Sequence, residues 1–340
     1  MAKLLLNVYC THRGPPPLTF AHKLNARRDR TDPELAEHLD GFMGFVMGGG
    51  RRQMNASRYH VLGHLGRVRH HLSLEVDERD MDAFAQWATA ANAIIFFTDS
   101  TVRTPDGAIL VDPETGDAEP GVDVPYPPDA LARKARSEQK LSSLGIRVPR
   151  SLPPTVSEVE VELREPREVI QRSLALFNCA VRAESLASKD PIPVSELKER
   201  NPTGFAAFSP SERAFIQAER PDQQTITNYV WRYEALNVLA WSVGAVAELP
   251  FPKGICDAGA LAKTMFGVME DFKPGPRSTA EVLDVLDLHY RLHWATTDAR
   301  VNETTPPPGV EPGVVAERHY ALNWLTRFQE AEWDDVETPT

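Results

Sequence analysis

The chain has 340 residues, of which 42% are hydrophobic and 25% are charged, and its formal net charge is −11. This length favours about two domains, and this composition excludes an intrinsically disordered chain. Residues 235–249, the most apolar stretch, are too few and too often interrupted by polar residues to form a transmembrane helix, so we expect no membrane interaction.

Charge is distributed unevenly along the chain. Residues 1–75 carry 11 lysines and arginines against 6 aspartates and glutamates. Because the whole chain carries −11, the net charge of the remaining residues is −16. This asymmetry indicates either an anion-binding surface on the basic part or packing of basic against acidic surfaces. The basic cluster at residues 27–30 has no interleaved aromatic residues that would stack on bases, which disfavours nucleic acid as a partner.

Three cysteines, Cys10, Cys179 and Cys256, lie far apart and show no spacing typical of a zinc or redox site. They favour a reducing compartment. Polar residues interrupt the apolar run at residues 1–10 before it reaches the length of a signal peptide, so we expect a first β-strand there and a cytoplasmic protein.

The N-terminal part alternates strand and helix patterns. Thr31-Asp32-Pro33-Glu34 starts a helix, and Gly48-Gly49-Gly50 ends it. The expected order is β-α-β-β-α-β, which is typical of a ferredoxin-like α/β sandwich. Its elements are strands at 3–9, 59–65, 68–76 and 93–97 and helices at 33–47 and 77–91. A hairpin at 101–111, turning at Pro105-Asp106-Gly107, is added to this sheet.

A proline-rich segment at residues 120–128 can continue neither a helix nor a central strand, so we expect it to be a linker. We therefore predict an α+β fold with a ferredoxin-like domain at 1–119, an all-α domain at 129–334 and a frayed acidic tail at 335–340.

Helical patterns fill the C-terminal part. Ser209 with Glu212 and Ser278 with Glu281 form capping boxes that start helices at 210 and 279. Residues 224–249 are expected to form the most apolar helix, at the centre of a bundle. Other helices are expected at 130–144, around 170–181 and at 314–333.

Four blocks of the C-terminal part, at residues 231–241, 249–257, 286–294 and 317–324, resemble in their order a bacterial family known as domain of unknown function 4272. The first block begins Trp231-Arg232-Tyr233-Glu234, and the third contains Leu286-Asp287-Leu288-His289. The resemblance covers residues 129–334. It implies a cytoplasmic bacterial protein and no particular chemistry.

Two constellations could carry chemistry. His289 and His293 lie four residues apart, on one side of a helix, and would bind a metal if Asp257, Glu234 or His319 supplied a third ligand. Ordinary hydrogen-bonded helical histidines are far commoner, so we expect no metal and no cofactor.

The second constellation is a set of charged residues within tryptophan-rich blocks. It could form a pocket in which arginine binds a carboxylate or phosphate and glutamate acts as a base, or a structural salt-bridge network. With the two histidines, the candidate residues are Trp231, Arg232, Glu234, His289, Arg291, His293, Glu317 and Arg318.

In the N-terminal part, His60, His64, His70 and His71 are expected to form a surface cluster rather than a site, because neighbouring residues of a strand point to opposite faces. No nucleotide-binding, hydrolase or kinase motif occurs. The sequence therefore favours a non-catalytic binding protein, an adaptor or an immunity-type partner of another protein. The alternative is an enzyme that acts on a small anionic substrate through the candidate pocket, with or without a metal.

Overall fold

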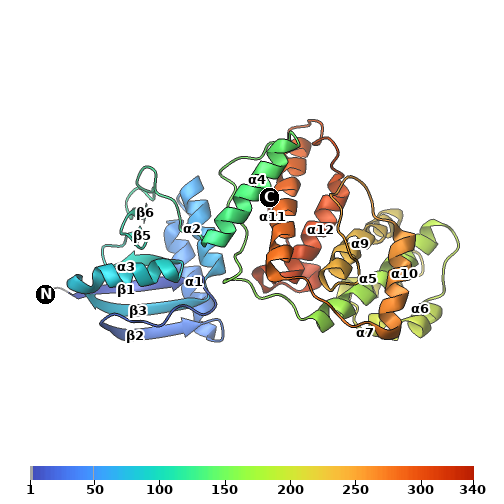
Figure 1. Cartoon of the computed structure of the whole chain (residues 1–340), viewed down its shortest axis with the longest axis horizontal. Coiled ribbons are helices and arrows are strands. Elements are labelled where there is room, and N and C mark those ends of the chain that lie inside the picture. Colours follow the sequence, from blue (N-terminus) through green and yellow to red (C-terminus); the bar gives the residue numbers. More distant parts are fainter. Residues whose placement is uncertain (1–2, 49) are drawn as a thin grey trace. The chain divides into compact units, whose positions relative to one another are not determined.

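The structure is a computed structural model that describes residues 3–48 and 50–340. The chain divides into two compact units (Figure 1). The first comprises the residues up to Ala132 together with Val156–Val161, and the second comprises Arg133–Thr155 and Glu162–Thr340. No helix in the described part of the chain is long and apolar enough to cross a membrane. The α+β class is confirmed.

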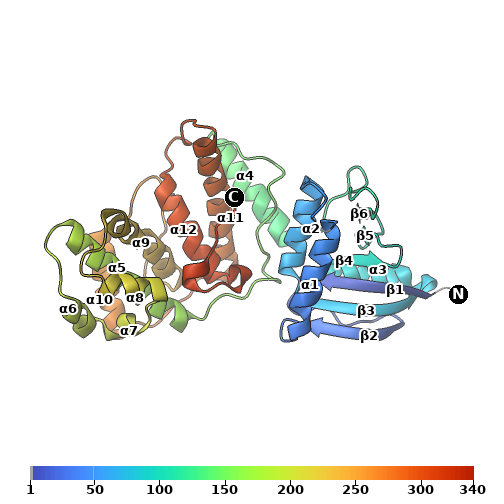
Figure 2. The same cartoon turned by 180° about the vertical axis from the view of Figure 1, so that it is seen from behind.

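The first unit is built on a six-stranded sheet in which each neighbouring pair of strands is antiparallel (Figure 2). The order in space is β2-β3-β1-β4-β5-β6. The strands are β1 (Lys3–Cys10), β2 (His22–Asp29), β3 (His70–Asp77), β4 (Ala93–Phe97), β5 (Val102–Arg103) and β6 (Ile109–Val111). The last two form the expected hairpin, so that prediction is confirmed.

Helices cover both faces of this sheet because the central strands alternate between two cores. Leu6 and Val8 of β1 belong to the core under α3 (Met81–Ala90). Tyr9 belongs to the core under α1 (Pro33–Val46) and α2 (Ala56–Arg67). Asp32 caps α1 as expected, by accepting a hydrogen bond from the backbone of Glu34.

One expected strand is wrong. Residues 59–65 lie inside helix α2, whose start is capped by the Asn55 side chain and whose Val61 and Leu65, four residues apart, are buried on one face. The strand that was missed is β2, an edge strand with mostly exposed side chains that lacks the apolar alternation of a half-buried strand. The β-α-β-β-α-β order is therefore wrong, because two consecutive helices separate β2 from β3.

Proline-rich residues 120–128 contact the core of the first unit. Val124 is buried there, and Val122 and Tyr126 pack against the same core. The division between the units falls further along the chain, between Ala132 and Arg133. Of the glycines expected to end α1, Gly48 adopts a positive φ of 57° and Gly49 lies outside the described residues.

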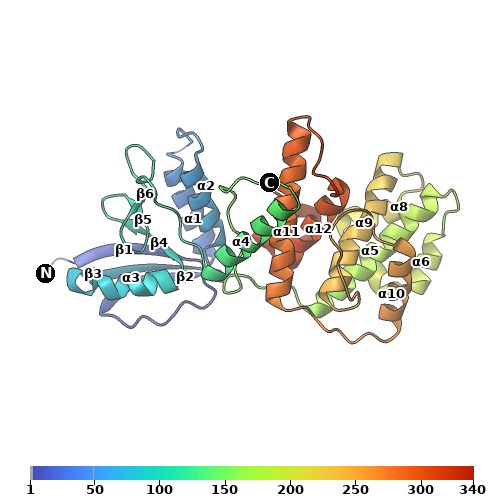
Figure 3. The same cartoon turned by 45° about the horizontal axis from the view of Figure 1, so that its top comes forward.

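The second unit is helical (Figure 3). Its described helices are α4 (Pro128–Ser143), whose first turns belong to the other unit, α5 (Pro166–Ala187), α6 (Val194–Arg200), α7 (Pro202–Ala206), α8 (Pro210–Gln217), α9 (Gln223–Ser242), α10 (Ala258–Asp271), α11 (Thr279–Val301) and α12 (Pro312–Leu325). Helix α9 packs against both α5 and α12, and α12 packs against α11. Both capping boxes are confirmed.

Two helices end earlier than expected. Helix α9 stops at Ser242 because Gly244 has a φ of +84° and lies so close to Gly275 that a Cβ would be 2.4 Å from the Gly275 carbonyl oxygen. Helix α12 stops at Leu325, before Arg327 in the left-handed region. The tail is not frayed: Val336 is buried, and the Asn323 side chain donates a hydrogen bond to the backbone of Glu337 at 2.8 Å.

Gly204 of α7 marks the closest approach between α7 and α5. A Cβ at this position would lie 2.3 Å from the backbone oxygen of Leu174. We expect Gly204→Ala to lower the free energy of unfolding by about 3 kcal/mol, because backbone atoms must move to admit the methyl group. Gly267→Ala in α10 is the control, since open space surrounds that position, and it should raise stability by about 0.5 kcal/mol. Urea unfolding measures both, and equal effects would contradict this account of α7.

Candidate functional site

Glu234 of α9 and Arg318 of α12 form an ion pair in the closed core of the second unit. Nε and Nη2 of Arg318 lie 3.1 and 3.0 Å from Oε2 of Glu234, and the two residues are 2% and 1% exposed. Arg318 also donates to the backbone oxygen of Pro250 at 2.7 Å, and Oε1 of Glu234 accepts a hydrogen bond from the backbone of Cys256. Both groups are therefore engaged with the protein itself.

Arg232 and Glu317, from the same two helices, form a more exposed pair. Nη1 of Arg232 donates to Oε2 of Glu317 at 3.1 Å, and the side chains are 23% and 20% exposed. Burial raises the pKa of Glu317, and the neighbouring Arg232 opposes that rise. The guanidinium lies over the ring of Tyr320, 4.7 Å from its centroid. Of the candidate ion pairs, this is the one that solvent reaches.

His289 and His293 lie on the side of α11 that faces α12, where His319 joins them. Nδ1 of His293 and Nδ1 of His319 are 2.9 Å apart, so one ring donates to the other. Nδ1 of His289 donates to its own helix at the Val285 carbonyl, 2.8 Å away, which leaves Nε2 buried without a partner.

The pKa values of these imidazoles lie below the ordinary value. Burial, assisted by the positive charges of Arg318 and Lys140, lowers the pKa of His289 to about 3. Burial likewise lowers the pKa of His293 and of His319. Within residues 3–48 and 50–340, no group of three or more histidine, cysteine, aspartate or glutamate side chains is arranged to hold a metal ion. The nearby cations also disfavour one.

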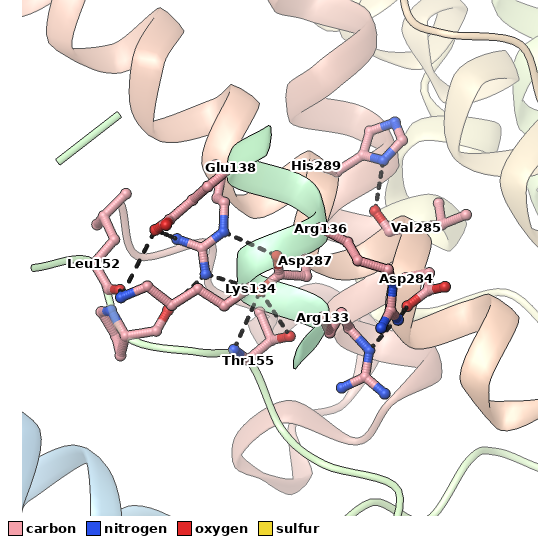
Figure 4. A network of polar contacts seen from close by, with 12 residues as sticks. Arg133, Lys134, Arg136, Glu138, Leu152, Thr155, Asp284, Val285, Asp287 and His289 are labelled. Atoms are coloured by element: carbon pink, nitrogen blue, oxygen red, sulfur yellow. Dashed lines mark hydrogen bonds and ion pairs between the residues drawn. The ribbon is translucent and has the colours of Figure 1, made fainter. Parts of the chain in front are cut away.

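Arg291 has a different set of partners from those of the histidines. Its Nε and Nη2 donate to the two oxygens of Asp287 at 2.8 and 3.0 Å, and both side chains are fully buried. Nη2 also donates to the backbone oxygen of Pro153, and Nη1 lies 3.6 Å from Glu138 of α4. Figure 4 shows Asp287 beside Thr155, whereas His289 points away toward Val285.

The eight candidate residues thus lie on three helices in separate groups. Glu234, Arg318, Arg232 and Glu317 bridge α9 and α12, the histidines lie between α11 and α12, and Arg291 contacts α4 and the loop before Thr155. Trp231 packs on Gly313, where a Cβ would lie 2.7 Å from the indole ring. The structure does not bring Arg291 together with Glu234 and Glu317.

Sequence reasoning missed several polar contacts of the helical unit. Asp287 is four positions before Arg291, and this helical spacing could have identified the pair. The buried pair Arg172–Glu212 and the Trp333 ring under Arg172 come from segments too distant for any local pattern. The Cys256 backbone contact with Glu234 has no signal in the sequence.

The histidines of the first unit do not form a surface cluster, so that prediction is wrong. His64 is buried because α2 is a helix packed on the sheet and not a strand, and His71 of β3 is buried beside His38 of α1. His64 contacts the Tyr9 carbonyl, and His71 lies against His38, with tilted rings whose centroids are 4.2 Å apart. Desolvation lowers the pKa of His64 to about 4 and of His71 to about 3.

The described chain therefore combines an antiparallel sheet unit with a helical unit whose charged candidates pair inside the fold. Residues 133–336 match the family model described as Domain of unknown function (DUF4272), and this match covers more than half of the chain. The chain belongs to that family, which confirms the expected resemblance. Comparison with curated proteins and comparison with solved structures each gave no match.

Proposed function

We propose that this chain is a non-catalytic binding protein, an adaptor or an immunity-type partner of another protein. The observation that supports this is the Glu234–Arg318 pair, in which each charged group is buried and satisfied by the protein itself. A catalytic acid, base or anion-binding group needs access to its substrate. Charged groups that pair inside the fold stabilise the helical unit. Binding of a partner then falls to residues on the surface.

The basic edge of the first unit is the surface we assign to the partner. Strand β2 lies at one end of the sheet order, so one side of its backbone is open to a further contact. Lys23 and Arg27 are exposed on it. Lys23 pairs with Glu75 at 2.8 Å, so it is the charge of Arg27 that favours an acidic protein surface.

The test combines recovery of a partner with charge reversal. A tagged full-length chain, purified from its source cells, is expected to carry a stoichiometric protein partner. The variant K23E/R27E should lose it, and the control K253E/K263E, which reverses two exposed lysines of the helical unit, should retain it. If no partner is recovered, or if both variants retain it equally, this proposal is wrong.

The alternative function is an enzyme that acts on a small anionic substrate through a Glu/Arg/His pocket. Its support is the Arg232–Glu317 pair, which solvent reaches and in which burial raises the pKa of Glu317. Stoichiometric zinc or manganese in the purified chain, measured by elemental analysis, would favour a metal-assisted form of this alternative. A small anion that stabilises the chain but not the variant R232M would favour a metal-free one.

Three further assignments stay proposals. The free state of Cys10, Cys179 and Cys256 supports a cytoplasmic location, and the resemblance supports a bacterial source. The spatial order β2-β3-β1-β4, antiparallel throughout, supports kinship of the first unit with ferredoxin-like sandwiches, although residues 11–21 between β1 and β2 contain no helix.

A further inference from the structure

The last ten residues, 331–340, form an arm that is docked on the helical unit. The Trp333 ring, 4% exposed, lies under the guanidinium of Arg172, 5.1 Å away, and against the rings of Trp324 and Tyr320. The carboxylate of Asp334 accepts hydrogen bonds from the backbone and hydroxyl of Ser211, at 2.8 and 2.6 Å.

Further contacts extend along the arm. Arg164 donates to the backbone oxygen of Ala331 at 2.7 Å, and Asn323 donates to that of Glu337. At the end of the arm, the Thr340 hydroxyl lies 3.3 Å from that of Thr297 on α11. The groups that bind the arm in these contacts come from α8, α11, α12 and α5 with the turn before it, all within the helical unit.

A strained hinge joins the arm to α12. Arg327, Gln329 and Glu330 have φ values of 52°, 55° and 53°, in the left-handed region that residues with a Cβ rarely adopt. None of the three is glycine, which would adopt this region without strain. The docked arm therefore requires three unfavourable backbone conformations within four residues.

We propose that the arm exchanges between two copies of this chain, so that each copy docks its residues 331–340 on the helical unit of the other. A second copy offers the same binding groups, so the contacts of Trp333 and Asp334 are kept. The hinge, extended between the copies, no longer needs left-handed backbone. Exchange of an identical element through a strained hinge is a low-cost route to a dimer. This inference does not rest on the proposed acidic partner.

The test uses thiols introduced at the end of the arm and at its docking position. Two full-length chains of different tag length, T297C and T340C, are mixed at high concentration, refolded together from urea and oxidised. An exchanged arm places the thiol at position 340 of one chain beside the thiol at position 297 of the other, so a disulfide-linked heterodimer is expected. Each variant oxidised alone sets the background, and the double variant T297C/T340C reports the arm docked within one chain.

Glycine substitutions in the hinge test whether its backbone strain causes the exchange. Adding R327G/Q329G/E330G to both chains relieves the strain of the unexchanged arm, so the heterodimer fraction should fall by about tenfold or more. The proposal is overturned by a heterodimer yield no higher than that of the single variants. It is equally overturned by a yield that the three glycines leave unchanged.

Discussion

Arg318→Met is expected to lower the free energy of unfolding of the helical unit by about 3–5 kcal/mol, because it leaves the Glu234 carboxylate buried without its cation. Methionine retains much of the volume, so the loss reports the charge more than a cavity. Urea unfolding followed by tryptophan fluorescence measures it. Five of the six tryptophans lie in the helical unit, so the signal reports mainly that unit.

The matched control is Arg200→Met. Arg200 pairs with Glu196 one turn away on α6, and its side chain is 63% exposed. Exposed pairs of this kind contribute about 0–1 kcal/mol, so the control should unfold almost as the parent protein does. If Arg318→Met cost no more than this control, Glu234 and Arg318 would not be a buried structural pair.

Acidification from pH 7 to pH 5 is expected to destabilise the helical unit by about 2 kcal/mol through His289, and His319 acts in the same direction. Burial holds the pKa of His289 at about 3 and that of His319 well below the ordinary 6.5. The unfolded chain therefore binds protons below pH 6.5 that the folded chain does not. Stability is fully present above pH 6.5 and falls as the pH drops toward 3.

The variant His289→Leu isolates one of these contributions. It should reduce the pH dependence of the unfolding free energy between pH 6 and pH 4 by about 1.4 kcal/mol per pH unit. Leu292→Ala, at a fully buried position of the same helix, should lower stability at every pH without changing that slope. A slope that His289→Leu leaves intact would mean that His289 is protonated in the folded state.

Where the sequence carried a local signal, the fold was predictable. The capping boxes at Ser209 and Ser278 and the hairpin turn at Gly107 depend on residues within a few positions of each other, and the structure has all three. The prediction of a strand at residues 59–65 was wrong because a short apolar run fits a helix as well as a strand. Strand β2 was not predicted because it pairs with β3 across more than forty residues of sequence and because most of its side chains lie in solvent.

The candidate site was predictable only as a list of residues. Helical spacing places His289 and His293 on one side of α11, and it also turns Arg291 away from them. The partners of each charge depend on which helices meet. Nothing in the local sequence shows that α12 brings Arg318 to Glu234, or that the chain before α5 brings the Pro153 carbonyl to Arg291.

The charged residues of the helical unit hold its fold together. A double-mutant cycle over E234Q, R318M and E234Q/R318M, measured by urea unfolding, tests this role most directly. We predict that each single variant loses about 3 kcal/mol or more and that the double variant, which buries no charge, loses less than either. Single variants as stable as the parent, or more stable, would contradict the claim and indicate a pocket kept for function.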